Sequence, residues 1–292
     1  MTNRTKGVAM ALSGGALWGA SGVSGQYLLQ VCAIDTEWLV AARMIAAGVI
    51  FLLFDSIKNR GDIFAVWKNR KDVTRLLFFS IVGMLLVQYS YFVCIEFGNA
   101  AAATVLQYTM PAFLVLYMSL SSRRLPRSIE VICVLLAMGG TFLLVTHGNP
   151  ETLAIPLPAL IWGLISGASG AVYTLAPKRL IHDYNAPLII GWGMIIGGIL
   201  PALFAPIWAV PAEWTLTEAA AFFYLVLFGS VFAFWLYLGS TQYIQPSEAG
   251  VIASVEPVTA IILSGLLLGQ PFVLMDFIGS ALILASVFLL AR

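Results

Sequence analysis

The stretch "GALWGASG" at residues 15–22 returns in altered form as "GLISGASG" at residues 163–170. In both copies a Gly-x-x-x-Gly motif runs directly into Gly-Ala-Ser-Gly. Motifs of this kind let two membrane helices approach closely. Because the chain holds 26 glycines, one recurring motif does not establish an internal duplication. Whether the protein is built from two related halves therefore depends on further repeated features of the sequence.

The composition places the chain in a membrane. Of its 292 residues, 60% are hydrophobic and 10% are charged, and the mean hydropathy is +0.94. Soluble domains carry about 25% charged residues. The apolar runs have the length of membrane helices, about 20 residues, and lack the alternation of barrel strands. The first run is too long, and too rich in Gly and Trp, for a cleaved signal peptide. We therefore predict an all-α integral membrane protein with ten transmembrane helices, at residues 7–28, 37–55, 75–95, 99–119, 129–146, 157–177, 187–208, 218–239, 247–268 and 273–291.

The basic residues predict the orientation. Lys and Arg precede the first predicted helix, fill the segments 58–75, 123–127 and 178–179, and end the chain. All of them fall on one side of a ten-helix topology. The opposite loops hold no Lys or Arg but carry the acids Asp35, Glu37, Glu151, Glu213 and Asp276. Since basic loops stay in the cytoplasm, we predict a multi-pass protein of the cytoplasmic (inner or plasma) membrane with both termini inside. The basic loops then contact anionic lipid and indicate no nucleic-acid partner.

Several classes of site are missing from the sequence. Cys32, Cys94 and Cys133 have no metal-type spacing and form no disulfide framework, although Cys32 and Cys94, both near the predicted outer face, leave one pairing open. His147 and His182 stand alone at helix ends. No Gly-x-x-x-x-Gly-Lys-Ser/Thr loop is present to bind ATP. We therefore predict no metal, no cofactor and no enzymatic activity, and any uphill transport has to draw on a gradient.

Further landmarks recur at a spacing close to that of the opening stretch. An offset of 146 residues relates Pro111 to Pro257, Gly83 to Gly229, Tyr91 to Tyr237, and "GGTFLL" (139–144) to "ASVFLL" (285–290). The opening pair needs an offset of 148, and "AARMIAAG" (41–48) matches "GWGMIIGG" (191–198) at 150. We predict two repeats, residues 1–147 and 148–292. Five helices is an odd number, so the second repeat is inverted, as in secondary transporters that bind their ligand near the bilayer midplane.

Two stretches of the sequence resemble a known family. The pair Trp18-Gly19 and the stretch "VEPVTAIILSGLLLGQ" (255–270) are similar to the EamA-like branch of the drug/metabolite transporter (DMT) superfamily. Its Glu-Pro-Val…Leu-Leu-Leu-Gly-Glu signature is matched here except at the last position, where Gln270 replaces Glu. The first repeat keeps Pro111 but has Met110 before it instead of an acid. The resemblance covers essentially the whole chain. It implies a central cavity lined by helices 1–4 and 6–9, with helices 5 and 10 peripheral. It also implies export or exchange of small metabolites, amino acids among them.

Glu256 is the sharpest candidate for a binding residue. It lies about ten residues into the ninth predicted helix, hence roughly 15 Å deep in a hydrocarbon core about 30 Å thick. An acid there costs about 2.5–3.5 kcal/mol, so it faces a cavity or a partner. Pro257 follows, deprives the Ala253 carbonyl of its helical hydrogen bond and favours a kink. Glu256 binds a cation, an ammonium group or a proton, or else it is protonated within the bundle or paired with Arg43.

Arg43 is the only basic residue inside a predicted helix, about seven residues from its outer end. It binds a substrate carboxylate, pairs with Glu256 or Glu96, or extends to the interface. If Arg43 and Glu256 both face the cavity, together they suit the carboxylate and ammonium groups of an amino acid.

Other polar and aromatic residues lie in the helices predicted to line the cavity. They are Trp18, Ser21, Gln88, Tyr91, Gln107, Tyr108, Ser169, Tyr173, Trp235, Tyr237 and Ser254. Their aromatic rings suit an organic cation or an apolar side chain and favour an organic substrate over a metal ion. Each of them is also suited to helix packing or to anchoring at the interface. We predict helix packing for Gly15, Gly19, Gly22, Gly163, Gly167 and Gly170, and helix kinks at Pro111 and Pro257.

The sequence thus favours a secondary transporter that moves a small organic metabolite, an amino acid or related amine, by alternating access. Its expected partners are that substrate, the lipid bilayer and protons. One alternative is a proton-coupled exporter of lipophilic organic cations. Another is a facilitative channel.

Overall fold

The structure is a computed structural model that describes residues 2–59, 62–121, 123, 125–149, 154–209, 214–244, 249 and 252–290. This part of the chain is helical and contains no strand. Six helical stretches are long and apolar enough to cross a membrane: 36–58, 70–97, 100–117, 128–146, 157–183 and 216–240. Shorter apolar helices cover 186–202, 255–268 and 274–289. The all-α membrane class is confirmed, whereas the number of ten spans stays a prediction.

The helices of the first half follow the predicted order. They are α1 (Asn3–Gln26) with the π-helical turn η1 (Tyr27–Val31), α2 (Thr36–Asn59), the 3-10 turn η2 (Ala65–Lys68), α3 (Arg70–Phe78), the π-helical turn η3 (Phe79–Leu85), α4 (Leu86–Phe97), α5 (Ala100–Gln107), α6 (Met110–Ser121) and α7 (Ser128–Thr146). The fourth predicted helix is therefore two helices, broken at Tyr108 and Thr109. Pro111, the second residue of α6, has no N–H to offer the Gln107 carbonyl, which accounts for the break; its side chain lies outside the described part.

The second half repeats this pattern. Its elements are α8 (Leu157–Leu175), α9 (Lys178–Asp183), α10 (Ala186–Ala202), α11 (Leu216–Val226), the π-helical turn η4 (Leu227–Phe232), α12 (Ala233–Ser240), α14 (Val255–Leu268) and α15 (Leu274–Leu290). The seventh predicted helix extends to residue 208, but α10 ends at Ala202, directly after Pro201. The beginning of the ninth predicted helix falls largely on residues outside the described part, as do Glu151 and Glu213.

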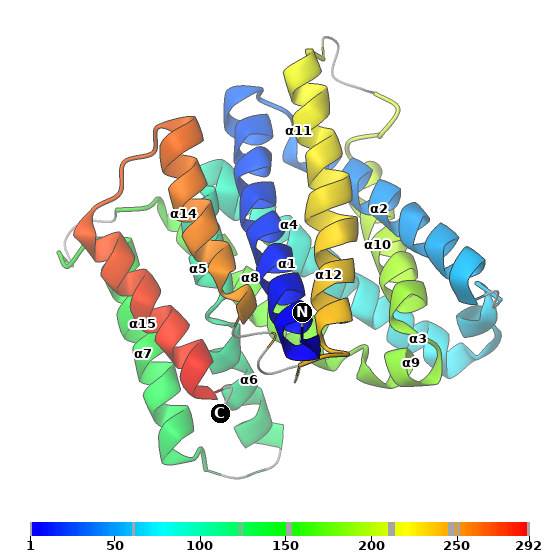
Figure 1. Cartoon of the computed structure of the whole chain (residues 1–292), viewed down its shortest axis with the longest axis horizontal. Helices are drawn as coiled ribbons and strands as arrows, with labels where there is room; N and C mark the ends of the chain where they lie inside the picture. Colours follow the sequence, from blue (N-terminus) through cyan, green and yellow to red (C-terminus); the bar gives the residue numbers. More distant parts are fainter. Residues whose placement is uncertain are drawn as a thin grey trace.

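The helices of the two halves pack on each other in a mirrored pattern. α1 packs against α12 and α14, and α8 packs against α4 and α5. α2 lies along α10, and α7 lies along α15. In Figure 1, α1 crosses the middle of the bundle, the α7–α15 pair forms one flank and the α2–α10 pair forms the other. The α2–α10 and α7–α15 contacts join helices at corresponding places in the two halves, and the contacts of α1 with α12 and α14 correspond to those of α8 with α4 and α5.

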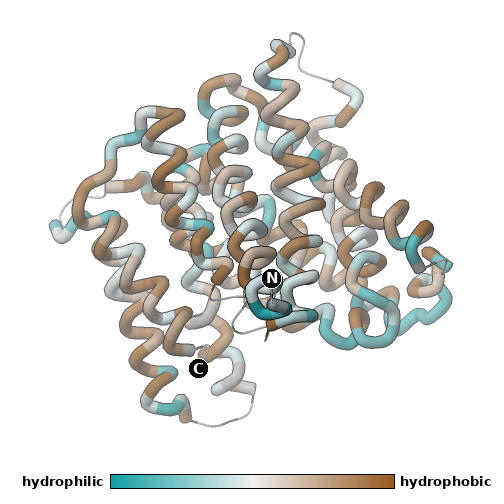
Figure 2. The backbone as a smooth tube through the Cα atoms, in the orientation of Figure 1, coloured by the Kyte–Doolittle hydropathy of each residue, from teal (hydrophilic) through white to brown (hydrophobic). Residues whose placement is uncertain are grey.

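The outward surface of the bundle is apolar where a bilayer would cover it. Large hydrophobic side chains are exposed along the helices, among them Leu120, Leu135, Met138, Phe142, Leu266, Leu267 and Phe277. Figure 2 shows hydrophilic residues gathered at the end of the bundle that carries α3 and α9, where α1 begins and α15 ends (Figure 1). The start of α1, the end of α15 and the basic segments near residues 70 and 178 therefore lie at one end of the molecule.

Candidate functional site

The centre of the candidate site is the first turn of α14. Ser254 is the N-cap residue of this helix, and Glu256 and Pro257 lie in its first turn. Glu256 is buried, with 9% of its surface exposed. No described basic side chain forms an ion pair with its carboxyl group. A titratable group thus lies in the interior of an apolar bundle, where it needs a partner.

Tyr108 is that partner. Its hydroxyl group lies 3.2 Å from Glu256 Oε2 and 3.2 Å from the carbonyl oxygen of Ala253. The Ala253 carbonyl is the group that Pro257 leaves without a helical hydrogen bond. Tyr108 itself lies just beyond the end of α5, at the break before α6. The two proline-associated breaks therefore meet at this hydroxyl.

Aromatic rings surround the Glu256–Tyr108 pair. Tyr237 of α12 is close enough to Tyr108 and to Tyr173 of α8 to interact with both electrostatically. Trp18 of α1 packs on Tyr237, with their ring centroids 5.2 Å apart. Tyr173 stacks on Phe79, with centroids 5.8 Å apart and planes at 30°. Four predicted residues therefore come together from α1, α8, α12 and the break between α5 and α6: Trp18, Tyr173, Tyr237 and Tyr108.

Arg43 is the second buried charge. Only 6% of its surface is exposed, so it does not extend to the membrane interface. Its Nε donates to Ser230 Oγ at 2.9 Å, and its guanidinium lies 4.9 Å from the ring centroid of Phe92. No described group accepts a hydrogen bond from its two terminal nitrogens. Arg43 pairs with neither Glu256 nor Glu96; Glu96 instead accepts from Thr36 Oγ1 at 2.7 Å.

Tyr91 lies near both charged residues. It lies close enough to Arg43 and to Glu256 to interact electrostatically with both. Its hydroxyl is hydrogen-bonded to Thr104 at 2.9 Å and lies against Gly22. Gln88, predicted to share a face with Tyr91, is half-buried and makes no side-chain hydrogen bond with the described residues. We define the central site as Arg43, Tyr91, Tyr108, Tyr237 and Glu256.

The remaining predicted residues are distributed around this site or away from it. Gln107 donates to Ser166 Oγ at 2.8 Å, a contact that ties α5 to α8. Ser169 is bound to its own helix at Ile165, and Ser21 packs on Gly229. Ser254 lies beside the Tyr108 hydroxyl. Trp235 does not join the others, because half of its surface is exposed on the side of the bundle.

The glycines of the opening stretch lie where helices cross. A Cβ atom at Gly15 would collide with the carbonyl oxygen of Ala253, just before α14, and one at Gly19 with the carbonyl oxygen of Glu256 in α14. One at Gly163 or Gly167 would collide with Leu106 and Thr109, at the end of α5. Gly22 and Gly170 lie against the Tyr91 hydroxyl and the Met110 sulfur. These glycines contact the helices that carry the central site.

Several contacts of the site were not predicted from the sequence. Ser230 and Phe92 hold Arg43, and Thr104 holds Tyr91. Ser230 directly follows Gly229, which recurs at the repeat spacing, and Thr104 lies one helical turn before Tyr108. Their places in the sequence could have marked Ser230 and Thr104 as candidates, but could not have shown which side chains they contact. Among the described residues, no three His, Cys, Asp or Glu side chains come together as metal ligands.

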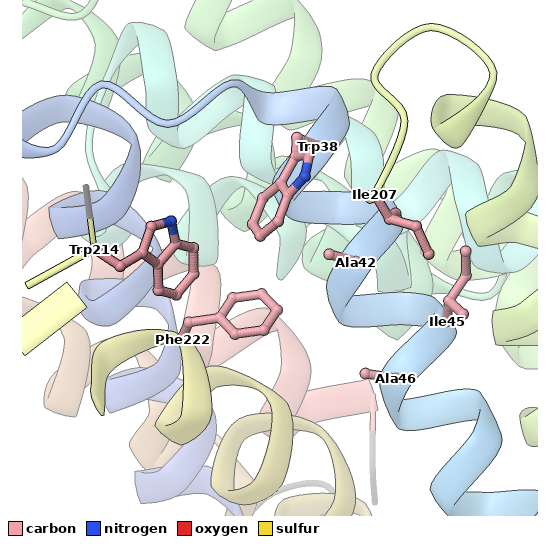
Figure 3. Close-up of a pocket in the computed structure, with 7 residues that line it drawn as sticks. All are labelled: Trp38, Ala42, Ile45, Ala46, Ile207, Trp214 and Phe222. Atoms are coloured by element: carbon pink, nitrogen blue, oxygen red, sulfur yellow. The ribbon is translucent and has the colours of Figure 1, made fainter. Parts of the chain in front are cut away.

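A separate hollow of about 370 Å³ lies between α2, α11 and the segment after α10. Figure 3 shows Trp38, Trp214 and Phe222 converging on one side of it, with ring centroids 5.3 to 5.6 Å apart. Its other lining residues are Ala42, Ile45, Ala46 and Ile207. None of these lining residues belongs to the central site, so the hollow is separate from it.

The chain resembles known proteins over its whole length. The sequence profile of the EamA-like transporter family matches it twice, at residues 5–146 and 157–292. A Salmonella typhimurium protein named as the uncharacterized inner membrane transporter YicL is 40% identical over 100% of this chain and 97% of its own. The uncharacterized transporter YetK of Bacillus subtilis is 25% identical over 94% of this chain and 83% of its own. A solved structure, described only as the crystal structure of a protein, has a TM-score of 0.64 at 18% identity and covers 98% of this chain and 97% of its own. This last likeness concerns the fold alone.

Proposed function

The chain belongs to the EamA-like transporter family of the DMT superfamily, and from this membership we propose that it is a secondary transporter of an amino acid or a related amine. Membership makes it a multi-pass membrane protein of a transporter family, related to an inner-membrane transporter. The substrate and the mechanism are the proposal.

One observation carries the choice of substrate. Arg43 and Glu256 are both buried, are not paired with each other, and both lie within electrostatic range of Tyr91. A buried charge without a partner is costly. A zwitterion offers a carboxylate to the terminal nitrogens of Arg43 and an ammonium group to Glu256, so it would satisfy both at once. A lipophilic cation would satisfy Glu256 alone and leave Arg43 without an anion.

The hydrogen bonds of Tyr108 suggest how binding is coupled to a proton. A phenol has one proton to donate, yet the Tyr108 hydroxyl faces two acceptors, Ala253 O and Glu256 Oε2. Both contacts are satisfied when Glu256 carries a proton and donates it to Tyr108, which then donates to Ala253. When Glu256 loses that proton, Tyr108 can serve only one of the two acceptors, and an incoming ammonium group can bind the other. Proton release and amine binding would then exchange at one carboxyl group.

We further propose ten membrane-spanning helices in two inverted repeats, residues 1–147 and 148–292, with both termini in the cytoplasm. The two separate matches to one family profile support the repeats. So does the mirrored packing, in which α1 meets α12 and α14 as α8 meets α4 and α5. Alternating access follows if the two repeats rock about the central site. The absence of Lys and Arg from the loops opposite the termini supports the orientation.

Counterflow in proteoliposomes tests the proposed substrate. Liposomes containing the purified protein are loaded with one unlabelled amino acid at a time, and uptake of the same labelled amino acid is measured with and without an imposed pH gradient. We expect at least one amino acid or amine to show saturable uptake that rises with internal substrate. Glu256→Gln should lower this uptake about ten- to a hundredfold, the effect of one charged hydrogen bond. Arg43→Lys should raise KM for amino acids and leave amines that lack a carboxylate unaffected.

Three other results would contradict the proposal. Uptake of the cation ethidium into inverted vesicles, driven by protons and lost in Glu256→Gln, with no amino-acid flux, would identify an exporter of lipophilic cations. Flux that neither saturates nor responds to internal substrate would identify a channel. Unchanged amino-acid flux in both Arg43→Ala and Arg43→Lys would remove Arg43 from the site.

A further inference from the structure

A partly polar cavity lies away from the central site, at the end of the bundle opposite the start of α1 and the end of α15. It has a volume of about 250 Å³ and is enclosed by α5, α7, α14 and α15, with residues 270–273 as one wall. Figure 1 shows these four helices together on one flank of the bundle. We call it the α7–α15 pocket. It is smaller than the roughly 300–1,000 Å³ of sites for drug-sized ligands, so it suits a small molecule.

Ser280 of α15 supplies the first sign that the α7–α15 pocket binds a ligand. The residue lines the pocket and has only 5% of its surface exposed, and its buried hydroxyl oxygen has no hydrogen-bond partner among the described residues. Several other buried serines bond to their own helix, as Ser286 does to the Ile283 carbonyl in the same helix. A buried hydroxyl without a partner costs about 1–3 kcal/mol. Because Ser280 lines the pocket, rotation about its χ1 would turn the hydroxyl toward a ligand there, which would supply the missing partner.

Asp276 supplies the negative charge of the α7–α15 pocket. Its Oδ1 is 2.8 Å from His147 Nε2, and its Oδ2 accepts from the Val273 N–H at 2.9 Å. A carboxylate has about four acceptor positions, so each oxygen can take one more hydrogen bond. When the imidazole is neutral and donates through Nε2, the pair keeps one negative charge. Asp276 is one turn of α15 away from Ser280, so the two side chains lie on the same face.

The surroundings favour a cation over an anion. No Lys or Arg occurs in the segments at this end of the chain, residues 27–42, 92–105, 143–160, 200–218 and 262–277. The lining also includes Phe272 and the apolar side chains of Val105, Leu144 and Ile261. An aromatic ring attracts a cation through its face, and the aliphatic side chains suit an apolar body. We propose that the α7–α15 pocket is a second binding site, for a small primary amine with an apolar body, in which Asp276 and Ser280 Oγ accept from the ammonium group.

This site does not depend on the proposed function, because none of its residues belongs to the central site. The test therefore uses purified full-length protein that carries Glu256→Gln, in which the central carboxyl group is gone. Binding of 2-phenylethylamine is measured by isothermal titration calorimetry and compared with 2-phenylethanol, an uncharged molecule of nearly the same shape. We expect the amine to bind at least tenfold more tightly than the alcohol, since only the amine offers a charged hydrogen bond.

Variants in the pocket locate the binding. Asp276→Asn keeps an acceptor for Val273 and should weaken binding of the amine about ten- to a hundredfold, and Ser280→Ala should weaken it about three- to tenfold. Ser286→Ala, on the same helix but outside the pocket, should leave binding unchanged. Ser280→Leu fills the pocket and decides the matter if Asp276→Asn does not fold. The proposal is overturned if the Glu256→Gln protein does not bind 2-phenylethylamine, or if folded Asp276→Asn or Ser280→Leu protein binds it as tightly as the parent.

Discussion

Two helix crossings pack through glycines in the same way but carry different side chains. Gly15 and Gly19 of α1 lie against the start of α14, and Gly163 and Gly167 of α8 lie against the end of α5. The first crossing carries Val-Glu-Pro at residues 255–257. The second carries Thr-Met-Pro at residues 109–111. At the repeat spacing, Met110 corresponds to Glu256, and both directly precede a proline.

Two other residues of the central site also differ from their counterparts in the other repeat. Tyr108, which binds Glu256, corresponds to Ser254 at the spacing of 146 residues. Arg43 corresponds to Gly193 at the spacing of the matched stretches 41–48 and 191–198. Gly193 lies against the ring of Phe79. Glu256, Tyr108 and Arg43 thus each have a small or apolar residue at the corresponding position, whereas Tyr91 and Tyr237 correspond to each other. Both crossings bring two helices close together, but only the first carries a buried acid. The packing of the helices is therefore separable from the residues that would bind a substrate.

The largest effect is expected from placing an acidic residue at the second crossing. Met110→Glu should destabilise the protein, because an acid inside a membrane helix costs about 2.5–3.5 kcal/mol and Ser254 is too short to reach it as Tyr108 reaches Glu256. Thermal unfolding of the detergent-purified protein measures the loss. Adding Ser254→Tyr to Met110→Glu should recover part of it. A Met110→Glu protein as stable as one with Met110→Leu would mean that the second crossing already accommodates a carboxyl group.

A smaller effect should be shared by both crossings. Gly19→Leu and Gly167→Leu each place a side chain against backbone or side-chain atoms of the facing helix. Overpacking of this kind costs about 1–3 kcal/mol, so both variants should lower the melting temperature by similar amounts. Gly139→Leu in α7 is the matched control, since a Cβ atom there meets nothing within 4 Å. If only one of the two crossing variants destabilises, the crossings do not share a scaffold.

The sequence predicts the fold better than it predicts the site, for a physical reason. A bilayer is a uniform apolar solvent, so the length of each apolar run and the position of the basic residues carry most of the information about helices. Proline also acts locally, and the break before Pro111 follows from its missing N–H. The seventh helix is shorter than predicted because Pro201 and the turns after it interrupt a run that hydropathy alone continues.

The contacts of the site depend on the rotation of each helix, which hydropathy does not determine. Trp235 and Tyr237 lie in one helix and were both predicted to line the cavity, yet Trp235 is half-exposed and Tyr237 faces Trp18. In a helix that is apolar all round, no polar face indicates the direction of the interior. Arg43 is similar: its type and depth were evident, but its contacts with Ser230 and Phe92 depend on how α2, α4 and η4 are arranged in space.

The smallest of the three effects concerns a single hydroxyl group. Tyr108→Phe removes the contact with Glu256 and Ala253 while it keeps the ring, and one neutral hydrogen bond is worth about 0.5–1.5 kcal/mol. We therefore expect up to about a tenfold rise in KM for the transported substrate, together with a changed dependence of flux on pH, because the proton of Glu256 loses its acceptor. Tyr173→Phe is the control, since the described residues offer its hydroxyl no hydrogen bond and its ring still stacks on Phe79. If the two variants behave alike, Tyr108 serves only to pack the bundle, and the distinction between the crossings rests on Glu256 and Arg43 alone.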